Sequence, residues 1–437
     1  MNRICAWIAA CGLVLLSGCN TARQAPAAGM APASPADAEL AQRIDSYFAP
    51  LAATSDISGT LRVERGGAPV LVRHFGHADW VRRKPHTEHT LYSAASVTKG
   101  ITAATLVTLA RDGTVSLDDP VGRWLPALGG YPGMTLRAVL RHRAGLPRDL
   151  PDTFVPPQSV EEWLAAHPEQ VGAAGEESYS NVGYALLAEV IAAAAGAPLA
   201  QVAEQRVLRP AGMADSAIRI GTAGHFPGGA LPYTAGPAPA GVMTPVPANL
   251  ATGSSGLVTT AADLAKWART LADGAYPELF AGDDPLGSID VGSDGNGEYV
   301  AVQGSLPGYV ANAIAWRGHD LTVSFAGNLF SYPALNLEDA LRGLLGDDPP
   351  PAPKPRPAAV PLSAEHLRLA GEHRHPDFGP IRIAHDPARG GMVLTMPDRP
   401  AYWSFHLTPI ADGAFHWRAF DRVLRLDGSG SLTSAKR

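Results

Sequence analysis

After a first helix, the hydrophobic pattern of the chain changes from strand-like to helical and then back to strand-like. Near the start, apolar residues at helical spacing predict a helix from Asp37 to Ala52, and alternating stretches predict strands near Gly59–Glu64 and Val70–Phe75. The middle of the chain is mainly helical in pattern, with loops rich in glycine and proline. Strands return near Tyr299–Gln303, Tyr309–Trp316 and Leu321–Gly327, followed by a helix near Leu335–Leu345. This order predicts an α+β fold, in which an antiparallel sheet is flanked by terminal helices and carries an α-helical subdomain.

A proline-rich segment separates this region from the C-terminal part of the chain. Residues 347–362 have the composition of a semi-rigid linker, so we expect the main domain to occupy residues 37–346. Residues 363–437 contain short alternating apolar stretches separated by turns. This pattern predicts a small all-β domain.

The N-terminus has the pattern of an export signal. Arg3 is the only charge before an apolar stretch at residues 4–16, which is too short to cross a bilayer and is typical of a signal-peptide core. Residues 16–19, Leu-Ser-Gly-Cys, resemble a bacterial lipobox, so residues 1–19 are predicted to be a lipoprotein signal peptide in which Cys19 is lipidated. The alternative is an ordinary cleaved signal with an incidental cysteine. Residues 20–36 are rich in alanine, proline and serine and are predicted to form a flexible tether.

The cysteines and the residue after the lipobox refine this expectation. The three cysteines of the chain are Cys5, Cys11 and Cys19, so none is left for an internal disulfide after cleavage. Asn20 is not the aspartate that retains lipoproteins in the inner membrane. We therefore expect an outer-membrane anchor through the N-terminal lipid only, with the folded part facing the periplasm.

Composition and charge exclude several classes of function. The hydrophobic content of 46% and charged content of 17% are ordinary for a globular protein, and the net charge of −6 comes with no basic stripe. Nucleic-acid binding is therefore not expected. We find no dinucleotide, Walker-type or Gly-x-Ser-x-Gly motif, and we expect no cofactor. The histidines at 373–377 and 86–89 lack zinc-site spacing and are interpreted as a surface turn and as loop polarity, so no metal site is predicted.

The strongest chemical signal is a serine followed three residues later by a lysine. Ser96 stands where helical periodicity begins, and Lys99 lies on the same helical face. The amine can therefore sit beside the hydroxyl and help to activate it as a nucleophile. At a helix N-terminus, the Ser96 N–H is also free to stabilise an oxyanion. The alternative is an N-cap serine with a solvated lysine.

A tyrosine and an asparagine two residues apart strengthen this interpretation. Tyr179 and Asn181 precede a second apolar helical run that ends at Gly196. The phenol of Tyr179 can carry a proton, and the amide of Asn181 can bind both the lysine and a substrate amide. The alternative is a buried aromatic residue followed by a helix-capping asparagine.

Together with four further segments, these motifs resemble the serine β-lactamase and penicillin-binding superfamily. The segments are residues 116–126, 134–147, 212–216 and 255–264, and Ala144 stands where the second of them usually has a serine. The resemblance covers roughly residues 38–346 and is to the class C β-lactamase branch, which includes D-alanyl-D-alanine carboxypeptidases and esterases. It implies the β-lactamase/transpeptidase fold with Ser96, Lys99, Tyr179 and Asn181 as catalytic residues. The C-terminal part is similar to the lipocalin-like domains that follow some members.

The third motif of this superfamily departs from the usual pattern. It falls on Val302-Gln303-Gly304-Ser305, and Val302 stands where a lysine or histidine normally helps to hold a substrate carboxylate. Valine cannot do so. The backbone N–H of Ser305 can still supply the second oxyanion donor, since a backbone group does not depend on the side chain.

Three hypotheses about function follow. The first is a serine esterase or peptidase that forms an acyl-enzyme on an ester or amide substrate, favoured by Val302. The second is a β-lactamase or D-alanyl-D-alanine carboxypeptidase, favoured by the family resemblance. The third is a non-catalytic penicillin-recognising protein that binds or senses. The expected partner is a small-molecule or peptide substrate.

Overall fold

The computed structural model describes residues 34–151, 159–219, 226–234, 253–281, 285–306, 308–331, 337–346, 349–351, 353–354, 356–386, 391–399 and 403–436. The predicted signal peptide, the lipobox with Cys19 and most of the tether lie outside these residues. Among the described residues no single helix has the length and apolar character to span a membrane. The bent pair Asn181–Ala195 and Leu199–Leu208 meets that test on length and composition alone.

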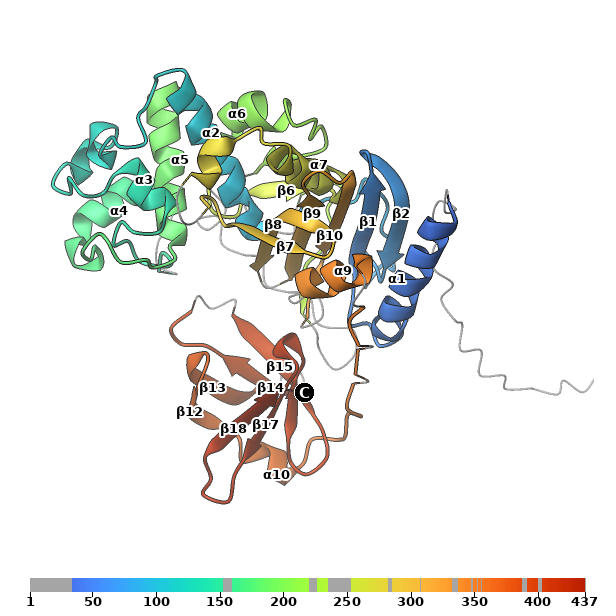
Figure 1. Cartoon of the computed structure of the whole chain (residues 1–437). Helices are drawn as coiled ribbons and strands as arrows, with labels where there is room; N and C mark the ends of the chain where they lie inside the picture. Colours follow the sequence, from blue (N-terminus) through green and yellow to red (C-terminus); the bar gives the residue numbers. More distant parts are fainter. Residues whose placement is uncertain are drawn as a thin grey trace, which may run out of the picture.

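One six-stranded antiparallel sheet organises the main part of the chain (Figure 1). Its strand order is β2-β1-β10-β9-β8-β7, so the N-terminal hairpin pairs with strands that come more than 240 residues later. The strands are β1 (Gly59–Arg65), β2 (Ala68–Phe75), β7 (Ile289–Asp294), β8 (Gly297–Leu306), β9 (Tyr309–Trp316) and β10 (Leu321–Gly327). This confirms the predicted antiparallel sheet, to which β7 is an unpredicted addition.

Helices cover both faces of this sheet. Helix α7 (Ala261–Ala272) packs against β1, β9 and β10 on one face. On the other face, α1 (Pro35–Ala53) packs against β2, and α9 (Leu337–Leu345) packs against β9. Helix α1 begins two residues earlier than predicted because Ser34 caps it and Pro35 occupies its first position, where a missing N–H costs nothing.

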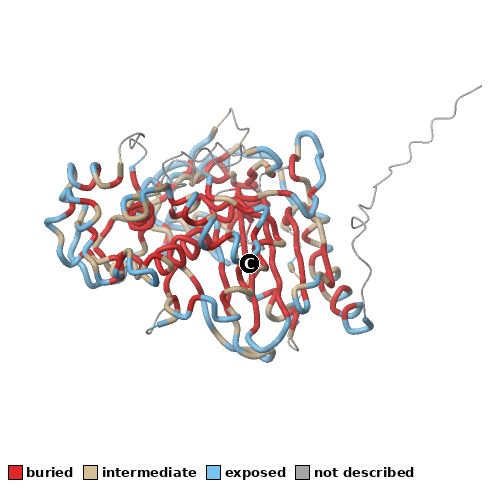
Figure 2. The backbone as a smooth tube through the Cα atoms, turned by 90° about the horizontal axis from the view of Figure 1, so that it is seen from above, coloured by how far each residue is buried: buried red, intermediate tan, exposed pale blue. Residues whose placement is uncertain are grey.

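A helical region lies beside the sheet and shares a hydrophobic core with one of its faces. Figure 2 shows this core as a continuous band of buried backbone that runs from the helices into the strands. The helices are α2 (Thr98–Arg111), α3 (Leu136–Leu140), α4 (Val160–Ala166), α5 (Asn181–Ala195) and α6 (Leu199–Ala203). Short strands connect the two regions: β3 (Tyr92–Ser93), β4 (Ala217–Ile218) and β6 (Leu257–Thr259) form one sheet, and β5 (Tyr233–Thr234) pairs with β11 (Leu329–Phe330).

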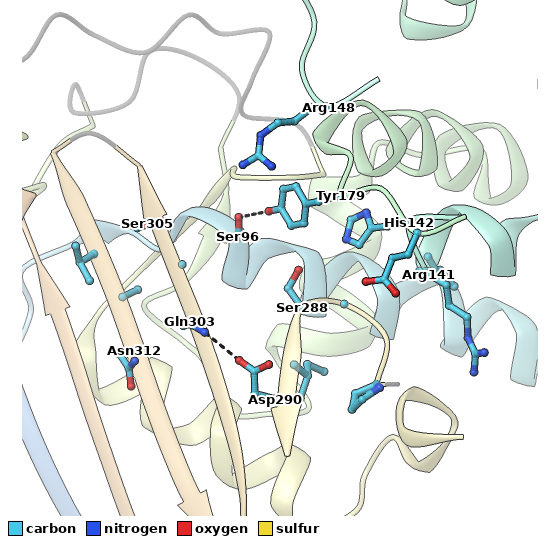
Figure 3. Close-up of a pocket in the computed structure, with 18 of the residues that line it drawn as sticks. Ser96, Arg141, His142, Arg148, Tyr179, Ser288, Asp290, Gln303, Ser305 and Asn312 are labelled. Carbon is cyan, nitrogen blue, oxygen red and sulfur yellow. Dashed lines mark hydrogen bonds between the residues drawn. The ribbon is translucent and has the colours of Figure 1, made fainter. Parts of the chain in front are cut away.

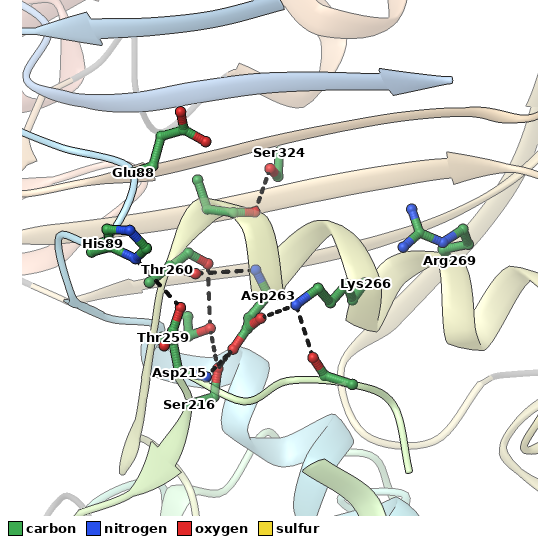
Figure 4. Close-up of polar contacts among 12 residues, drawn as sticks. Glu88, His89, Asp215, Ser216, Thr259, Thr260, Asp263, Lys266, Arg269 and Ser324 are labelled. Atoms are coloured by element: carbon green, nitrogen blue, oxygen red, sulfur yellow. Dashed lines mark hydrogen bonds and ion pairs between the residues drawn. The ribbon is translucent and has the colours of Figure 1, made fainter. Parts of the chain in front are cut away.

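Two of the segments that carried the family resemblance are joined by one buried carboxylate (Figure 4). Thr260 caps α7, and Asp263 in its first turn is fully buried. Asp263 accepts hydrogen bonds from the Asp215 N–H at 2.8 Å and the Ser216 hydroxyl at 2.9 Å, and it pairs with Lys266 at 2.7 Å. These bonds fix the loop before β4 against the start of α7.

The C-terminal part is a separate seven-stranded antiparallel sheet, as its alternating pattern predicted. The first and last strands approach each other, since His375 on β12 bonds to Ser434 on β18 at 2.8 Å, so the sheet is nearly closed. Its strands are β12 (Gly371–His375), β13 (Gly379–Asp386), β14 (Gly391–Thr395), β15 (Ser404–Pro409), β16 (Phe415–Trp417), β17 (Arg422–Leu426) and β18 (Leu432–Lys436), after the short helix α10 (Ala364–Leu367). The lipocalin-like character of this unit remains a prediction.

Two interpretations of histidine segments from the sequence are confirmed only in part. Pro376 and Asp377 lie in an exposed turn, but His375 belongs to strand β12 and is 1% exposed. Residues 87–89 are an exposed loop, whereas His86 is 4% exposed and bonds to the hydroxyls of Tyr92 at 2.7 Å and Ser58 at 3.2 Å, so it belongs to a buried network. In both cases hydrogen-bond partners distant in sequence make the burial possible.

The C-terminal sheet contacts the main part of the chain through an aromatic cluster and an ion pair. Phe330 at the end of β11 packs against Trp403, Phe405 and Phe420, with ring centroids 5.7–6.0 Å apart. Beside this cluster, the buried Arg418 pairs with Asp56. These contacts join the C-terminal unit to the end of β11 and to the segment just before β1.

Candidate active site

Ser96 lies in a tight turn between β3 and α2. The turn is a single 3₁₀ turn, Ala95–Val97, that leads directly into α2, so the predicted helical start at Ser96 is confirmed with a tighter first turn. Ala95 has a φ of 47°, a left-handed conformation that costs an alanine about 1–2 kcal/mol. Such strain concentrates at functional sites, where surrounding contacts hold it in place. The N–H of Ser96 belongs to the first turn and has no helical acceptor.

Lys99 is fully buried beside Ser96, so the alternative of a solvated lysine is wrong. Its amine donates to the Ser96 Oγ at 3.1 Å, the Asn181 Oδ1 at 2.7 Å and the carbonyl of Ser254 at 3.1 Å. Burial lowers the pKa of Lys99, and the neighbouring Tyr179 and the carboxylate of Asp149 work against this shift.

Tyr179 completes the group around the serine (Figure 3). Its phenolic oxygen lies 2.8 Å from the Ser96 Oγ, and the Lys99 Nζ lies 4.8 Å from its ring centroid. Burial disfavours the phenolate, but the charge of Lys99, hydrogen bonds from Lys99 and Ser96, and the charge of Arg148 outweigh it and lower the pKa of Tyr179. The lowered pKa favours the phenolate form of Tyr179, which can accept a proton.

Asn181 occupies the first position of α5, and its amide is fixed at both ends. The Oδ1 accepts from Lys99, and the Nδ2 donates to the Asp149 Oδ1 at 2.6 Å. The helix cap is Ser180, whose hydroxyl accepts from the Gly183 N–H at 2.9 Å, so the alternative of a capping asparagine is wrong. Asp149 therefore orients Asn181, and through it Lys99.

Two residues of this site were missed from the sequence. Asp149 is the orienting carboxylate, and Arg148 holds its guanidinium over the Tyr179 ring, 4.9 Å from the centroid, pointing into the cleft in Figure 3. Both directly follow the Gly-Leu-Pro end of the 134–147 segment. Charged residues next to such a segment were the available signal.

Strand β8, the neighbour of the edge strand β7, passes close to Ser96 because it has a glycine at the crossing point. A Cβ on Gly304 would lie 2.3 Å from the Ala94 carbonyl oxygen and 2.7 Å from the Ser96 nitrogen. Leu306 and Tyr309 pair at the hairpin between β8 and β9. Because alternate pairs in an antiparallel ladder exchange hydrogen bonds, the N–H of Ser305 points away from β9 and toward the open edge. The structure thus brings the two predicted oxyanion donors, at Ser96 and Ser305, to one place.

Gly304→Ala is expected to lower kcat/KM by about 10²-fold or more, because β8 must move away from Ser96 by the order of an ångström. Steady-state hydrolysis of an activated ester would measure the loss. Gly130→Ala serves as the matched control, since a Cβ there meets no atom within 4 Å. Full activity in Gly304→Ala would contradict the close approach of strand and nucleophile.

Val302 does not line the cleft. It is 1% exposed and lies on the same face of β8 as Gly304, packed in the core shared with the helices. Val302 therefore offers no positive charge to a substrate carboxylate in the cleft.

His142 packs against the ring of Tyr179. Its ring lies 4.6 Å from the Tyr179 ring, and its Nδ1 accepts from the Ser180 N–H at 3.0 Å. Burial, together with the charges of Lys99 and Arg148, lowers the pKa of His142 to about 4. The imidazole is therefore neutral at physiological pH.

This shift predicts a loss of stability in acid. Between pH 6.5 and 4 the unfolded chain binds a proton at residue 142 that the folded chain does not, so the free energy of unfolding falls as the pH falls, by up to about 3 kcal/mol. His142→Asn keeps an acceptor for the Ser180 N–H but cannot titrate. Urea unfolding of both proteins across this range is expected to give a shallower pH dependence for the variant. Identical dependence would contradict the shifted pKa.

Ser96 and Tyr179 line a cleft with a volume of about 510 Å³, and the buried Lys99 lies beside it. Ser96, Tyr179 and Arg148 lie on the helical side, and Gln303, Ser305 and Asn312 lie on the sheet side (Figure 3). Among the described residues, no three His, Cys, Asp or Glu side chains gather in a way that could hold a metal ion. The arrangement can perform nucleophilic attack, proton transfer and oxyanion stabilisation with its own side chains and backbone.

Comparison with known proteins places the chain in a family. A family model described as Beta-lactamase matches residues 44–344. Penicillin-binding protein 4* of Bacillus subtilis is 29% identical over 189 residues, which are 40% of this chain and 41% of that protein, so the chain spans about two fifths of its length. Esterase EstB of Burkholderia gladioli is 30% identical over 285 residues, which are 58% of this chain and 70% of that protein.

A solved structure extends the likeness into the C-terminal sheet. The octameric penicillin-binding protein homologue from Pyrococcus abyssi superposes with a TM-score of 0.59 at 20% identity, covering 91% of this chain and 95% of that chain. At this level of identity the likeness concerns the fold alone.

Proposed function

The chain belongs to the Beta-lactamase family, and we propose that it is a serine hydrolase that cleaves an ester or amide bond through an acyl-enzyme. The observation that carries this proposal is that the Ser96 Oγ lies within hydrogen-bond distance of both Lys99 and Tyr179 in one cleft. Nucleophile, proton acceptor and orienting groups are then in place before substrate arrives.

We assign Tyr179 as the general base. In this assignment Lys99 acts as an ammonium, which donates to the Ser96 Oγ, the Asn181 Oδ1 and the Ser254 carbonyl, and its charge stabilises the Tyr179 phenolate. Ser96 accepts one of these bonds, so its own proton can pass to the Tyr179 oxygen, which accepts it as a phenolate and becomes a neutral phenol as the Oγ attacks the carbonyl carbon. The neutral phenol then gives the proton to the leaving group. In the second half of the reaction the regenerated phenolate takes a proton from the water that attacks the acyl carbon, and passes it to the Ser96 Oγ as the acyl bond breaks.

The developing charge on the substrate oxygen would be held by two backbone donors. These are the N–H groups of Ser96 and Ser305, which the close approach at Gly304 brings together. Fixed donors of this kind are worth about 3 kcal/mol or more each in related reactions.

The substrate class follows from the charges around the cleft. Val302 removes the usual carboxylate-binding cation, which favours a neutral substrate and hence an esterase or a peptidase. A second candidate, a β-lactamase or D-alanyl-D-alanine carboxypeptidase, is favoured by Arg148, whose guanidinium faces the cleft and could hold a carboxylate. The relatives include a named esterase and a named penicillin-binding protein, and so fit both candidates.

Turnover assays separate these candidates. The purified protein would be incubated with p-nitrophenyl esters, penicillin and peptides ending in D-alanyl-D-alanine, with product formation and intact mass followed together. We expect ester or amide turnover. Turnover of penicillin or of the D-alanyl peptides alone would select the second candidate, and a stable adduct or no reaction would leave a binding or sensor protein.

The location is proposed separately. The lipobox-like residues 16–19 support lipid attachment at Cys19 and an outer-membrane anchor facing the periplasm. Cells that express the chain would be labelled with a palmitate analogue. Lipid on the wild type and none on Cys19→Ala is expected, and an unlabelled wild type would contradict the proposal.

A further inference from the structure

Beside the oxyanion position, four side chains of β8 and β9 form a block on one face of the sheet. Gln303 pairs with Asn312 and Ser305 pairs with Val310, and residues two apart on a strand share a face. All four line the cleft that holds Ser96. In Figure 3, Gln303, Ser305 and Asn312 lie across the cleft from Arg148 and Tyr179.

Asn312 has a polar atom for which the described residues offer no partner. Its side chain is 3% exposed, and its Oδ1 is buried without a hydrogen bond in the part of the chain that the structure describes. A buried acceptor left unsatisfied is costly, and the great majority of such atoms in native proteins are paired. Because Asn312 lines the cleft, a turn of its amide would bring this acceptor to a donor on a bound ligand.

The C-terminal unit closes this block with an aromatic side chain. Trp403 precedes β15 and lines the same cleft as Ser96. It is half-buried, and its ring is held edge-on against Phe330 and Phe405, with both centroids 5.9 Å away. Together with the apolar Val310, the indole offers a surface for an uncharged apolar group.

The charges near the block exclude some ligands. Arg141 and Arg148 lie on the helical side of the cleft in Figure 3, and on the sheet side the Asp290 carboxylate accepts from the Gln303 amide at 3.0 Å. A ligand carboxylate placed at Asn312 would face the Oδ1, which is also an acceptor, without a positively charged side chain among the described residues of the sheet side beside it. A ligand with an N–H group next to an apolar side chain can donate to the Asn312 Oδ1 and pack its apolar group against the indole of Trp403.

We propose that Asn312, Val310 and Trp403 form a substrate subsite that binds a peptide-like segment, with a backbone N–H donated to the Asn312 Oδ1 and an apolar side chain against Trp403. This rests on the proposed serine hydrolase function and deepens it, because it selects amide-containing substrates with apolar residues. It also gives the C-terminal unit a direct part in substrate recognition.

The test measures binding of peptide analogues to the full chain. Ser96→Ala prevents turnover, and the L and D forms of N-acetyl-trileucinamide, each also made with one backbone N–H at a time replaced by oxygen, serve as ligands in calorimetry. We expect one replacement to weaken binding by about 10-fold, as for the loss of a buried hydrogen bond. In Ser96→Ala/Asn312→Leu that penalty is expected to disappear.

Further variants keep the outcome decisive. Trp403→Ala is expected to weaken binding of every analogue by several-fold, whereas Trp124→Ala, outside the cleft, leaves it unchanged. Asn312→Leu removes an unsatisfied acceptor, so its urea midpoint is not expected to fall. Binding with no N–H position sensitive to Asn312, or no binding of either series, would overturn the subsite.

Failure of the subsite and failure of the hydrolase function give different results. Reaction of the wild-type protein with a small fluorophosphonate depends on Ser96 and does not need the subsite. Normal labelling of the wild type with no coupling in the peptide series rejects the subsite alone. Absence of labelling in the wild type rejects the hydrolase function itself.

Discussion

Ser96→Ala is expected to reduce kcat by at least about 10³-fold, because the nucleophile is lost while binding groups remain. The fold is expected to survive. The change removes one hydroxyl that is bonded to Tyr179 and Lys99, which is worth about 1–2 kcal/mol of stability at most.

Steady-state ester hydrolysis and urea unfolding of the same preparation would measure both effects. Ser178→Ala is the matched control, since this exposed serine precedes Tyr179 and makes its bond to His142 through the backbone. Unchanged turnover in a folded Ser96→Ala protein would show that another group carries the reaction.

Tyr179→Phe is expected to lower kcat by about 10²–10⁴-fold, the range of a lost general base. The ring and its packing on His142 are retained, so only the oxygen 2.8 Å from Ser96 is lost. Binding of substrate should change little, and the loss should therefore lie in kcat and not in KM.

Lys99→Met provides the comparison that identifies the base. Methionine fills a similar volume without a charge, but leaves the Asn181 and Ser254 oxygens without their donor, so both activity and stability are expected to fall. If Tyr179→Phe keeps a wild-type rate while Lys99→Met is inert, the lysine is the base and the assignment to Tyr179 is wrong.

The strands predicted most closely are those buried on both faces. Strands β9 and β10 are buried at every position and are rich in β-branched, alanine and aromatic residues, so their apolar pattern was clear. Strand β7 was missed because its sequence, Ile-Asp-Val-Gly-Ser-Asp, has a turn-like composition and is half exposed at the edge of the sheet. Strands β12 and β18 were missed for the same reason, since polar residues dominate both.

The candidate site was predicted where neighbours in sequence are also neighbours in space. Ser96 and Lys99 share one helical face, and the structure brings both to Tyr179 and Asn181, as the paired motifs suggested. Asp149 could not be assigned in the same way, because its contact with Asn181 depends on how a loop lies against α5.

Residues from distant parts of the chain were beyond reach for a similar reason. Asn312 reads as one polar residue in an apolar strand, and Trp403 as a core aromatic of the C-terminal sheet. Their place in the cleft depends on strand register and on contacts between two separate sheets, neither of which the local pattern encodes.

The most direct test of the account is to map where a fluorophosphonate attaches to the purified protein. Intact mass followed by peptide sequencing is predicted to give one probe per chain, on Ser96, with labelling strongly slowed in Tyr179→Phe. A probe found on a different residue, or a wild-type protein that stays unmodified, would contradict the claim that Ser96 is an activated nucleophile.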